Sequence, residues 1–169
     1  CLKELTKHCP DIPVLGIISP AAEKVAHSCS QNNSVGIIGT KATIKSNAYE
    51  RYINRLSPKI PIHGVACPAL VPLIEEGIIE NEIMDLSIQY YMDRFLKYHK
   101  IDTLVLGCTH YPLIMQNISR LYPRLSIIDP SREIAADIKK LLTERDMLAK
   151  GSDFENTFFA SDLSENFIN

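Results

Sequence analysis

The sequence predicts an α/β fold built from parallel-sheet lobes with helices on both faces. Short β-branched runs alternate with segments whose apolar residues recur at helical spacing, which is typical of strand–helix–strand units. The runs are apolar at nearly every position, as expected for strands that are buried on both faces. Six strands are expected, at Val14–Ile18, Val35–Ile38, Ile60–Val65, Thr103–Leu106, Ser126–Ile128 and Thr157–Ala160.

Three of the intervening segments have an apolar face at helical spacing. The expected faces are Tyr49, Tyr52, Ile53 and Leu56 in the first segment, Ile79, Ile83, Leu86 and Tyr90 in the second, and Ile134, Ile138, Leu141 and Leu142 in the third. A helix is expected to begin at Asp129-Pro130, ahead of the third of these faces. The Asp carboxylate can accept hydrogen bonds from free amides of the first turn, and Pro lacks only an N–H that would have no helical partner.

Composition and charge exclude several classes of protein. The 169 residues are 46% hydrophobic and 22% charged, which is ordinary for a folded chain. With a net charge of −2, the chain lacks the excess of basic residues that is typical of proteins binding nucleic acid or an anionic membrane. No run approaches the ~20 apolar residues of a membrane span. The five cysteines are widely spaced and form no CxxC pair, which predicts free thiols in a reducing cytoplasm and no metal site.

Reactive side chains follow the expected strand at 103–106. Gly107 ends this strand, and Cys108, Thr109 and His110 come next, before a helix expected near Tyr111. A helix N-terminus favours a thiolate and can hold a carboxylate on its free N–H groups. An imidazole can exchange a proton near neutral pH. A buried structural cysteine beside a capping threonine is the alternative, but three reactive groups after one strand favour a functional site.

A second strand-to-helix turn carries two hydroxyls. Thr40 and Thr43 follow the strand at 35–38 and lie one helical turn apart, so both can face an anionic group. The glycine spacing is not that of a P-loop. Thr40 as a plain helix cap explains the spacing equally well.

A third segment ends in two carboxylates. Glu75 and Glu76 precede Gly77, which is typical of the end of a helix. Carboxylates at a helix C-terminus oppose the helix dipole, so one of them could face a histidine or a substrate amine. Taken alone, the spacing favours the simpler interpretation, which is two solvated end charges.

Together these segments resemble the cofactor-independent aspartate/glutamate racemase family, and its glutamate racemases in particular. The strongest match is Leu106-Gly107-Cys108-Thr109-His110-Tyr111-Pro112-Leu113, which is similar to the second cysteine motif of that family. Residues 39–49 and 66–77 match two more family segments in the same order, and residues 11–18 resemble the strand that leads into the second lobe.

The resemblance implies two pseudo-symmetric lobes, each with one catalytic cysteine. Residues 1–18 would be the end of the first lobe and the crossover, 19–130 the second lobe with its catalytic cysteine, and 131–169 the return to the first lobe. The Asp-Ser and Cys-Asn-Thr-Ala motifs of the first lobe have no counterpart in these 169 residues. We therefore expect the chain alone to be inactive.

The resemblance also implies the chemistry, which is conversion of L-glutamate to D-glutamate for peptidoglycan synthesis. Cys108 would be the acid/base on one face of the substrate, tuned by His110, with Glu75 orienting His110. Thr109, His110, Thr40 and Thr43 would hold the substrate carboxylates. The implied partners are glutamate and a second copy in a homodimer, with no nucleic acid, membrane, metal or pyridoxal cofactor.

Three alternatives remain at this point. The substrate could be aspartate or a related amino acid, because racemases for those substrates share the mechanism with two cysteines. The chain could instead be a non-catalytic module that binds a small ligand. A thiol hydrolase using Cys108 and His110 is the poorest of the three, because side chains two residues apart on a turn rarely face each other.

Overall fold

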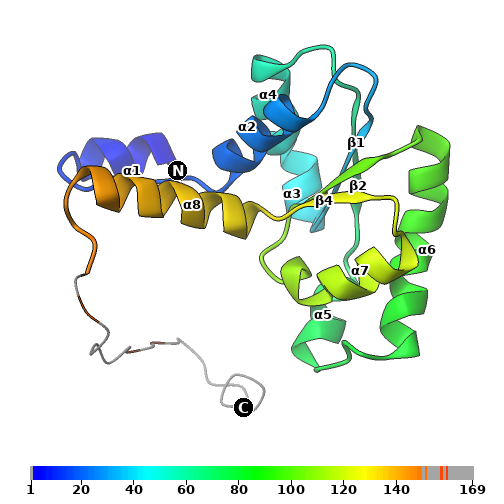
Figure 1. The fold of residues 1–169 in the computed structure, drawn as a ribbon. Helices are drawn as coiled ribbons and strands as arrows, with labels where there is room; N and C mark the ends of the chain where they lie inside the picture. The colour runs from blue at the N-terminus through cyan, green and yellow to red at the C-terminus, as the bar shows by residue number, and fades with distance from the viewer. Residues whose placement is uncertain (1, 150, 152–156, 158, 160–169) are drawn as a thin grey trace.

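Four parallel strands form the centre of the chain (Figure 1). The computed structural model describes residues 2–149, 151, 157 and 159. The strands are β1 (Val35–Gly39), β2 (Ile62–Ala66), β3 (Thr103–Leu106) and β4 (Ser126–Ile128). They pair in the order β2-β1-β3-β4, all in parallel, which confirms the predicted fold class.

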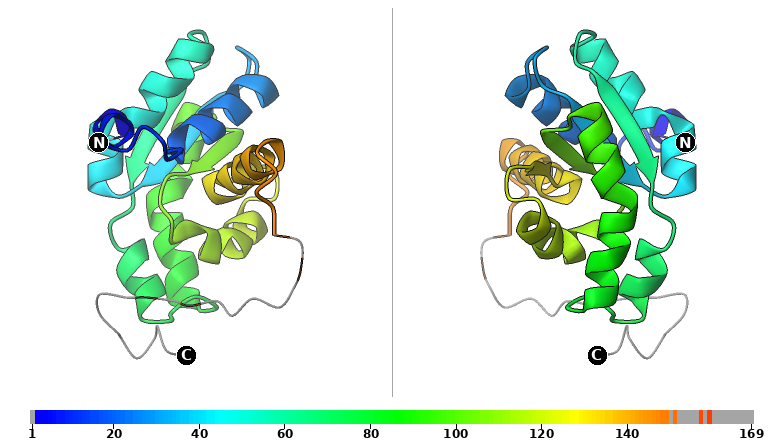
Figure 2. Two further views of the ribbon diagram at one scale, coloured as in Figure 1. Left: turned by 90° about the vertical axis from the view of Figure 1, so that its left-hand side faces the viewer. Right: turned by 90° about the vertical axis from the view of Figure 1, so that its right-hand side faces the viewer.

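Helices cover both faces of this sheet (Figures 1 and 2). One apolar cluster joins one face of the sheet to α2 (Ile18–Ser28), α3 (Lys41–Ser46) and α4 (Ala48–Leu56). The other cluster joins the opposite face to α5 (Leu70–Glu75), α6 (Glu82–His99), the 3-10 helix η1 (Tyr111–Ile114) and α7 (Met115–Leu121). The central strands β1 and β3 are buried along their whole length, as their unbroken apolar runs predict.

Two more helices, α1 (Leu2–His8) and α8 (Pro130–Glu144), form an arm on one side of the sheet together with residues 9–12, which follow α1 (Figure 1). The first turns of α8 pack on α2, and the rest of the helix extends away. Large apolar side chains of the arm are exposed, among them Leu5, Ile12 and Ile138. No helix of the described chain has the length and apolar character needed to cross a membrane.

The order of the strands creates a reversal between β1 and β3. From β1 the chain passes through α3 and α4 to β2 on one side, and it then returns through α5 and α6 to β3 on the other side. Because the crossovers use opposite faces, the carboxyl ends of β1 and β3 form a switch point between them. In open α/β sheets such a switch point is where ligands bind.

The carboxyl ends of β1 and β3 approach each other closely. The Gly107 N–H donates a hydrogen bond of 2.7 Å to the carbonyl oxygen of Ile38. A Cβ on Gly107 would lie only 2.7 Å from the same oxygen, so any larger residue would force the strands apart. Thr43 fills the adjacent space, with its Cγ2 at 3.4 Å from that Cβ position. Glycine is therefore needed where β3 ends.

Some predicted strands differ from the structure. Residues 13–16 form no strand, and Ile18 begins α2, so the strand expected at Val14–Ile18 is wrong. An apolar run becomes a strand only when its backbone groups pair with a neighbouring strand. The described sheet consists of β2, β1, β3 and β4 and does not include this run. β2 begins two residues later than expected, at Ile62. The strand expected at Thr157–Ala160 includes Phe158 and Ala160, which lie outside the described residues.

The buried face of α6 is also different from the predicted one. Ile83, Leu86 and Tyr90 are 52%, 57% and 81% exposed. The helix instead buries Met84, Ile88 and Met92 against the sheet. Because α6 carries two apolar stripes, each at helical spacing, the pattern alone does not decide which stripe faces the core.

The other predicted helix faces are partly confirmed. Tyr49 and Ile53 of α4 are buried, whereas Leu56 is half exposed at the end of the helix. On α8, Ile138 is 40% exposed.

The corrected face of α6 can be tested with two identical substitutions on one helix. Ile88→Ala removes a fully buried side chain and should lower the free energy of unfolding by about 2–5 kcal/mol. Ile83→Ala, at a half-exposed position, should lower it by less than about 1 kcal/mol. Urea denaturation at low protein concentration measures both. Equal losses would show that the assignment of the buried face is wrong.

Candidate active site

The turn after β3 places three polar side chains at the switch point. Residues 108–110 form this turn, and η1 and α7 follow it, so the helix expected near Tyr111 is confirmed with a 3-10 first turn. The Tyr111 ring is buried, and its hydroxyl donates to the carbonyl oxygen of Cys67 at 3.0 Å. This bond ties the turn after β3 to the segment after β2.

Cys108, His110 and Glu75 lie in a chain of close contacts. The Cys108 Sγ is 3.9 Å from the His110 Nδ1, and the His110 Nε2 is 3.2 Å from the Glu75 Oε1. The expectation that side chains two residues apart on this turn face away from each other is therefore wrong. The backbone bends between Cys108 and Tyr111, where the Tyr111 N–H bonds to the Cys108 carbonyl, and the imidazole folds back toward the thiol.

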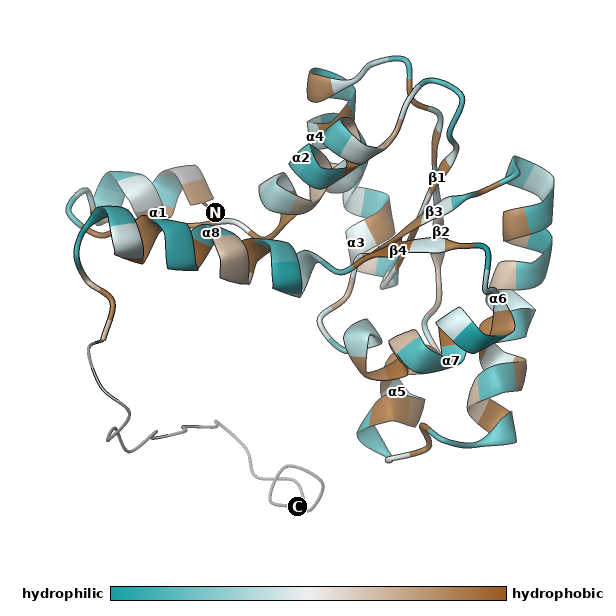
Figure 3. Cartoon of the chain, in the orientation of Figure 1, coloured by the Kyte–Doolittle hydropathy of each residue, from teal (hydrophilic) through white to brown (hydrophobic). Residues whose placement is uncertain are grey.

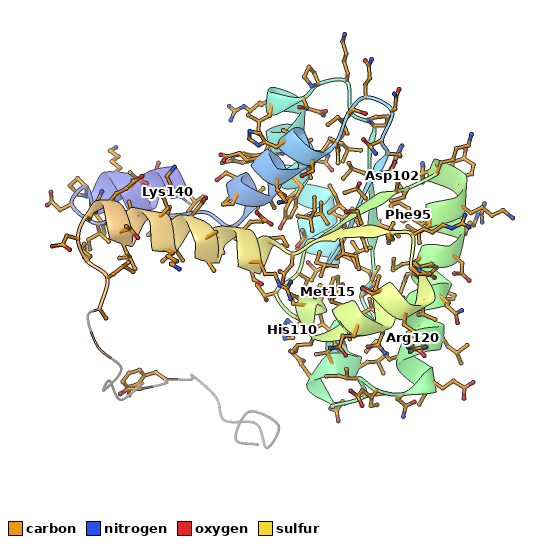
Figure 4. All side chains as sticks on the ribbon, in the orientation of Figure 1. Phe95, Asp102, His110, Met115, Arg120 and Lys140 are labelled. Atoms are coloured by element: carbon orange, nitrogen blue, oxygen red, sulfur yellow. The ribbon has the colours of Figure 1, made fainter. Side chains whose placement is uncertain are left out.

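Glu75 reaches His110 because of where α5 ends. The helix stops at Glu75, and Gly77 follows with φ +71°, the left-handed conformation expected after a helix C-terminus. Of the two carboxylates, Glu75 is therefore the one beside an imidazole. The side chains of His110 and Glu75 are 36% and 61% exposed, so their ion pair orients the ring more than it stabilises the fold. Figure 4 shows His110 near η1 and below the start of α8.

A small pocket opens beside the Cys108 thiol. Its lining comes from the start of α2, from α4, from the turn after β3 and from the start of α8: Ile17, Tyr49, Leu106, Gly107, Cys108, Thr109, Pro112, Asp129, Pro130 and Ser131. Cys108 and Thr109 therefore share one pocket. Segments far apart in the sequence meet here because each of them follows or precedes a carboxyl strand end.

Tyr49 is a pocket residue that the sequence pattern did not single out. Burial, and then the nearby Cys108 thiol, raise the pKa of its phenol to about 12. Tyr49 lines both the Cys108 pocket and a neighbouring pocket that contains Thr43. It thus connects the two strand-to-helix turns. Helical spacing identifies Tyr49 only as a core residue, because the spacing does not show where the hydroxyl points.

Asp129 and Ser131 were also missed as pocket residues. The predicted cap is confirmed, since the Asp129 Oδ1 accepts hydrogen bonds from the Ser131 N–H at 2.9 Å and the Ser131 hydroxyl at 2.6 Å. The same residues follow β4, whose carboxyl end lies at the same edge of the sheet as those of β1 and β3. Applying the strand-end rule to β4 would have found them.

The two threonines after β1 are not among the residues that line the Cys108 pocket. The Thr40 hydroxyl caps α3 by accepting from the Thr43 N–H at 3.2 Å, and the two hydroxyls lie 3.0 Å apart. The capping interpretation of Thr40 is therefore correct. Thr43 packs against Gly107, directly before Cys108, and faces the neighbouring pocket. Thr109 is exposed at the mouth of the Cys108 pocket.

Cys67 is a different kind of thiol. It is fully buried, and burial raises its pKa to about 12. Cys108 is only partly buried and lines the pocket. Cys9, Cys29, Cys67 and Cys108 are all unpaired. Within the described residues no group of three His, Cys, Asp or Glu side chains is arranged to hold a metal ion.

The sheet and its switch-point pocket define an α/β protein with a cysteine site. Residues 1–138 match the Asp/Glu/Hydantoin racemase family. The chain belongs to this family, which confirms the resemblance seen in the motifs.

Two relatives that this chain resembles in sequence are glutamate racemases. Glutamate racemase from Sulfurihydrogenibium sp. (strain YO3AOP1) is 47% identical over 130 residues, covering 77% of this chain and 49% of the relative. Glutamate racemase from Persephonella marina is 41% identical over 157 residues, covering 93% and 58%. The chain spans about half the length of the curated relatives it matches.

A solved structure agrees with the fold. The crystal structure of glutamate racemase from Francisella tularensis, in complex with D-glutamate, superposes on this chain with a TM-score of 0.86 at 32% identity. The match covers 98% of this chain and 60% of that one. The relationship therefore extends from the motifs to the whole arrangement of the described elements.

The Cys67 and Cys108 thiols should differ sharply in reactivity. Iodoacetamide at pH 8 should alkylate Cys108 in the native chain, whereas Cys67 should react only in urea. With a pKa of about 12, about one Cys67 thiol in 10,000 is ionised at pH 8, and the thiolate is the reacting form. Peptide mass spectrometry of each cysteine over time measures this. Native-state alkylation of Cys67 as fast as that of Cys108 would contradict the assignment.

Proposed function

We propose that this chain forms one face of the active site of a glutamate racemase, in which Cys108 exchanges the α-proton of glutamate. The observation that carries the proposal is the Cys108 thiol in a pocket at the switch point, 3.9 Å from His110. Relatives at 47% and 41% identity are glutamate racemases, which favours glutamate over aspartate or a related amino acid. It also favours an enzyme over a non-catalytic binding module.

The chemical step is a proton transfer in which no other bond of the substrate is broken. The Cys108 thiolate takes the proton from Cα, and the electron pair remains on the substrate as a carbanion. A second acid on the opposite face then returns a proton to Cα, which inverts the configuration. In the reverse direction Cys108 is the acid and donates its thiol proton.

His110 and Glu75 would prepare the thiol for this exchange. The His110 ring stands beside the Cys108 Sγ and can take the thiol proton or hold it between turnovers. The Glu75 carboxylate on the other ring nitrogen fixes the orientation of the imidazole. Glu75 thereby acts through His110 and is a positioning residue.

Hydroxyls around the pocket would hold the substrate carboxylates. Thr109 lies at the pocket mouth, and Thr40 and Thr43 lie across the switch point beside Gly107. The Ser131 N–H and hydroxyl already bond to Asp129, so Ser131 shapes the pocket without being the first choice for binding an anion.

The second acid/base would come from a first lobe, as the family resemblance implies. We propose that residues 19–130 form the second lobe, and that 1–18 and 131–169 belong with the first. Part of the last range lies outside the described residues. The exposed apolar side chains of the arm, among them Leu5, Ile12 and Ile138, support this division, because a lobe packed there would cover them.

The biological setting follows from the product. D-Glutamate made by such an enzyme would supply peptidoglycan synthesis. We place the protein in the cytoplasm, since its four described cysteines are unpaired.

Loss of the Cys108 thiol tests the proposal. The N-terminal part of the Persephonella marina relative, up to the start of the match, is joined in frame to this chain. The chimera should racemise glutamate, followed by α-proton exchange in deuterated water by NMR. Cys108→Ser should lower the rate by about 10²–10⁴-fold, the usual contribution of a general acid/base. The 169-residue chain alone should show no racemisation.

Cys29→Ser is the matched control. Cys29 contacts Thr103 at the amino end of β3, the far edge of the sheet from the pocket, so this variant should keep full activity. Circular dichroism establishes that each chimera is folded. Unchanged turnover in Cys108→Ser, or racemisation by the 169-residue chain alone, would overturn the proposed roles.

Glu75 and its neighbour Glu76 provide a second matched pair in the same chimera. Glu75→Gln should lower the rate by up to about a hundredfold, because the imidazole loses the charge that orients it. Glu76→Gln should leave the rate unchanged. Neither change should move the unfolding midpoint, since both carboxylates are exposed. Equal rates for the two variants would remove Glu75 from the mechanism.

A further inference from the structure

The Tyr49 side chain is deeply buried, yet its hydroxyl is bonded to no described residue. Tyr49 is 5% exposed and belongs to the apolar cluster that joins α2, α4 and the sheet. Figure 3 shows hydrophobic residues along the strands of this sheet in brown. A buried hydroxyl normally has a hydrogen-bond partner, because burial removes the bonds that water would make. Within the described part of the chain, no hydrogen bond joins the Tyr49 hydroxyl to another group.

The Tyr49 hydroxyl therefore faces one of the two pockets that this residue lines. Among the described residues no enclosed polar side-chain atom is left without a partner, so this hydroxyl is open to a pocket and not sealed in the core. One pocket holds the Cys108 thiol, and the other holds Thr43. A buried ring with an open hydroxyl is the arrangement expected of a donor that serves a group in the pocket.

A break between two helices places Tyr49 at this position. Asn47 ends α3 and precedes α4 with φ 50°, the left-handed conformation that asparagine adopts more readily than most residues. The chain changes direction there, and Tyr49 follows in the first turn of α4. Its ring thus enters the core from the edge of the sheet where β1 and β3 end, between the two pockets.

Four titratable side chains lie around the Cys108 thiol. His110 is on the same turn, Tyr49 comes from α4, Asp129 follows β4, and Tyr111 begins η1. The Asp129 carboxylate also lines the pocket, and its negative charge opposes a second negative charge on the sulfur. A thiolate in this pocket therefore needs a hydrogen-bond donor that offsets the effect of Asp129.

Three of the groups around the thiol already have hydrogen bonds or contacts elsewhere. The Tyr111 hydroxyl donates to the carbonyl oxygen of Cys67, and the Ser131 hydroxyl donates to Asp129. The second ring nitrogen of His110 contacts the carboxylate of Glu75. The Tyr49 hydroxyl is the donor in this pocket that remains available among the described titratable groups.

Tyr49 is also suited to donate without becoming charged itself. Burial, and then the nearby Cys108 thiol, raise the pKa of its phenol to about 12. The phenol therefore keeps its proton at any pH at which the thiol ionises, and it can donate that O–H to an anion. In surroundings of low polarity such a hydrogen bond to a charged group is stronger than in water.

We propose that Tyr49 is a positioning residue whose hydroxyl donates a hydrogen bond to the Cys108 thiolate and stabilises its charged form. No proton leaves Tyr49 in this step, because the thiol proton passes to His110 while the Tyr49 O–H turns toward the sulfur. His110 thus receives the proton, and Tyr49 stabilises the charge that is left. The effect on turnover rests on the racemase function proposed above, whereas the contact between phenol and thiolate does not.

The pH dependence of Cys108 alkylation tests this contact in the 169-residue chain. Iodoacetamide reacts with the thiolate, so the alkylation rate of Cys108, followed by peptide mass spectrometry, rises with pH through a midpoint. Tyr49→Phe removes only the phenol oxygen. It should move the midpoint up by about one pH unit, because the thiolate loses a hydrogen bond.

Tyr52→Phe is the matched control for Tyr49→Phe. Tyr52 is on the same helix but does not line the Cys108 pocket, so the same change there should leave the midpoint where it is. Circular dichroism and urea unfolding should show both variants folded and as stable as the unaltered chain, since the Tyr49 hydroxyl bonds to no described residue.

The chimera with the Persephonella marina segment measures the effect on turnover. Tyr49→Phe should lower kcat for glutamate by up to about tenfold at pH 7, recover at higher pH, and leave KM within about twofold. If no chimera racemises glutamate, the proposed function fails, and the alkylation midpoint still decides the role of Tyr49.

Three results would each overturn the role of Tyr49. They are an unchanged Cys108 midpoint in Tyr49→Phe, equal shifts in Tyr49→Phe and Tyr52→Phe, and a raised KM with unchanged kcat. The last result would mean that the hydroxyl binds the substrate and not the thiolate.

Discussion

The site depends on how closely the carboxyl ends of β1 and β3 approach each other. Gly107 bonds to the Ile38 carbonyl at 2.7 Å and has no room for a side chain. Directly after this contact the chain turns outward, which places the Cys108 thiol at the open edge of the sheet. Thr43 packs into the space left by the missing side chain, so the turns after β1 and β3 are held together. The position of the Cys108 thiol in the pocket therefore depends on a backbone contact.

The position of this contact explains why so many segments contribute to one pocket. Crossovers on opposite faces create a switch point at the carboxyl ends of β1 and β3. Tyr49 comes from α4 and Asp129 from the end of β4, while Glu75, at the end of α5, contacts His110 beside the pocket residue Cys108. Cys67, which follows β2, is enclosed by the core, and burial raises its pKa. The fold therefore gives Cys67 and Cys108 different surroundings.

The sequence predicted what depends on local chemistry. The β1, β3 and β4 runs, the Asp129 cap, Gly77 after α5 and the reactive turn at Cys108 are all found where residue type and spacing indicated them. It could not predict what depends on a distant partner. Residues 13–16 are apolar at most positions but form no strand, and α6 has two apolar stripes of which only one is buried in the core. The contact between the His110 ring and the Cys108 thiol likewise involves a distant residue, because the same ring contacts Glu75, 35 residues earlier.

The central claim is that the β1–β3 switch point is a binding surface for glutamate. The most direct measurement is a titration of ¹⁵N-labelled chain with L- and D-glutamate, following backbone amide shifts by NMR. The account predicts that shifts concentrate at residues 39–43, at 107–111 and around Ser131, while those of β2 and α6 stay unchanged. Shifts confined to other parts of the chain, or none at saturating glutamate, would contradict it.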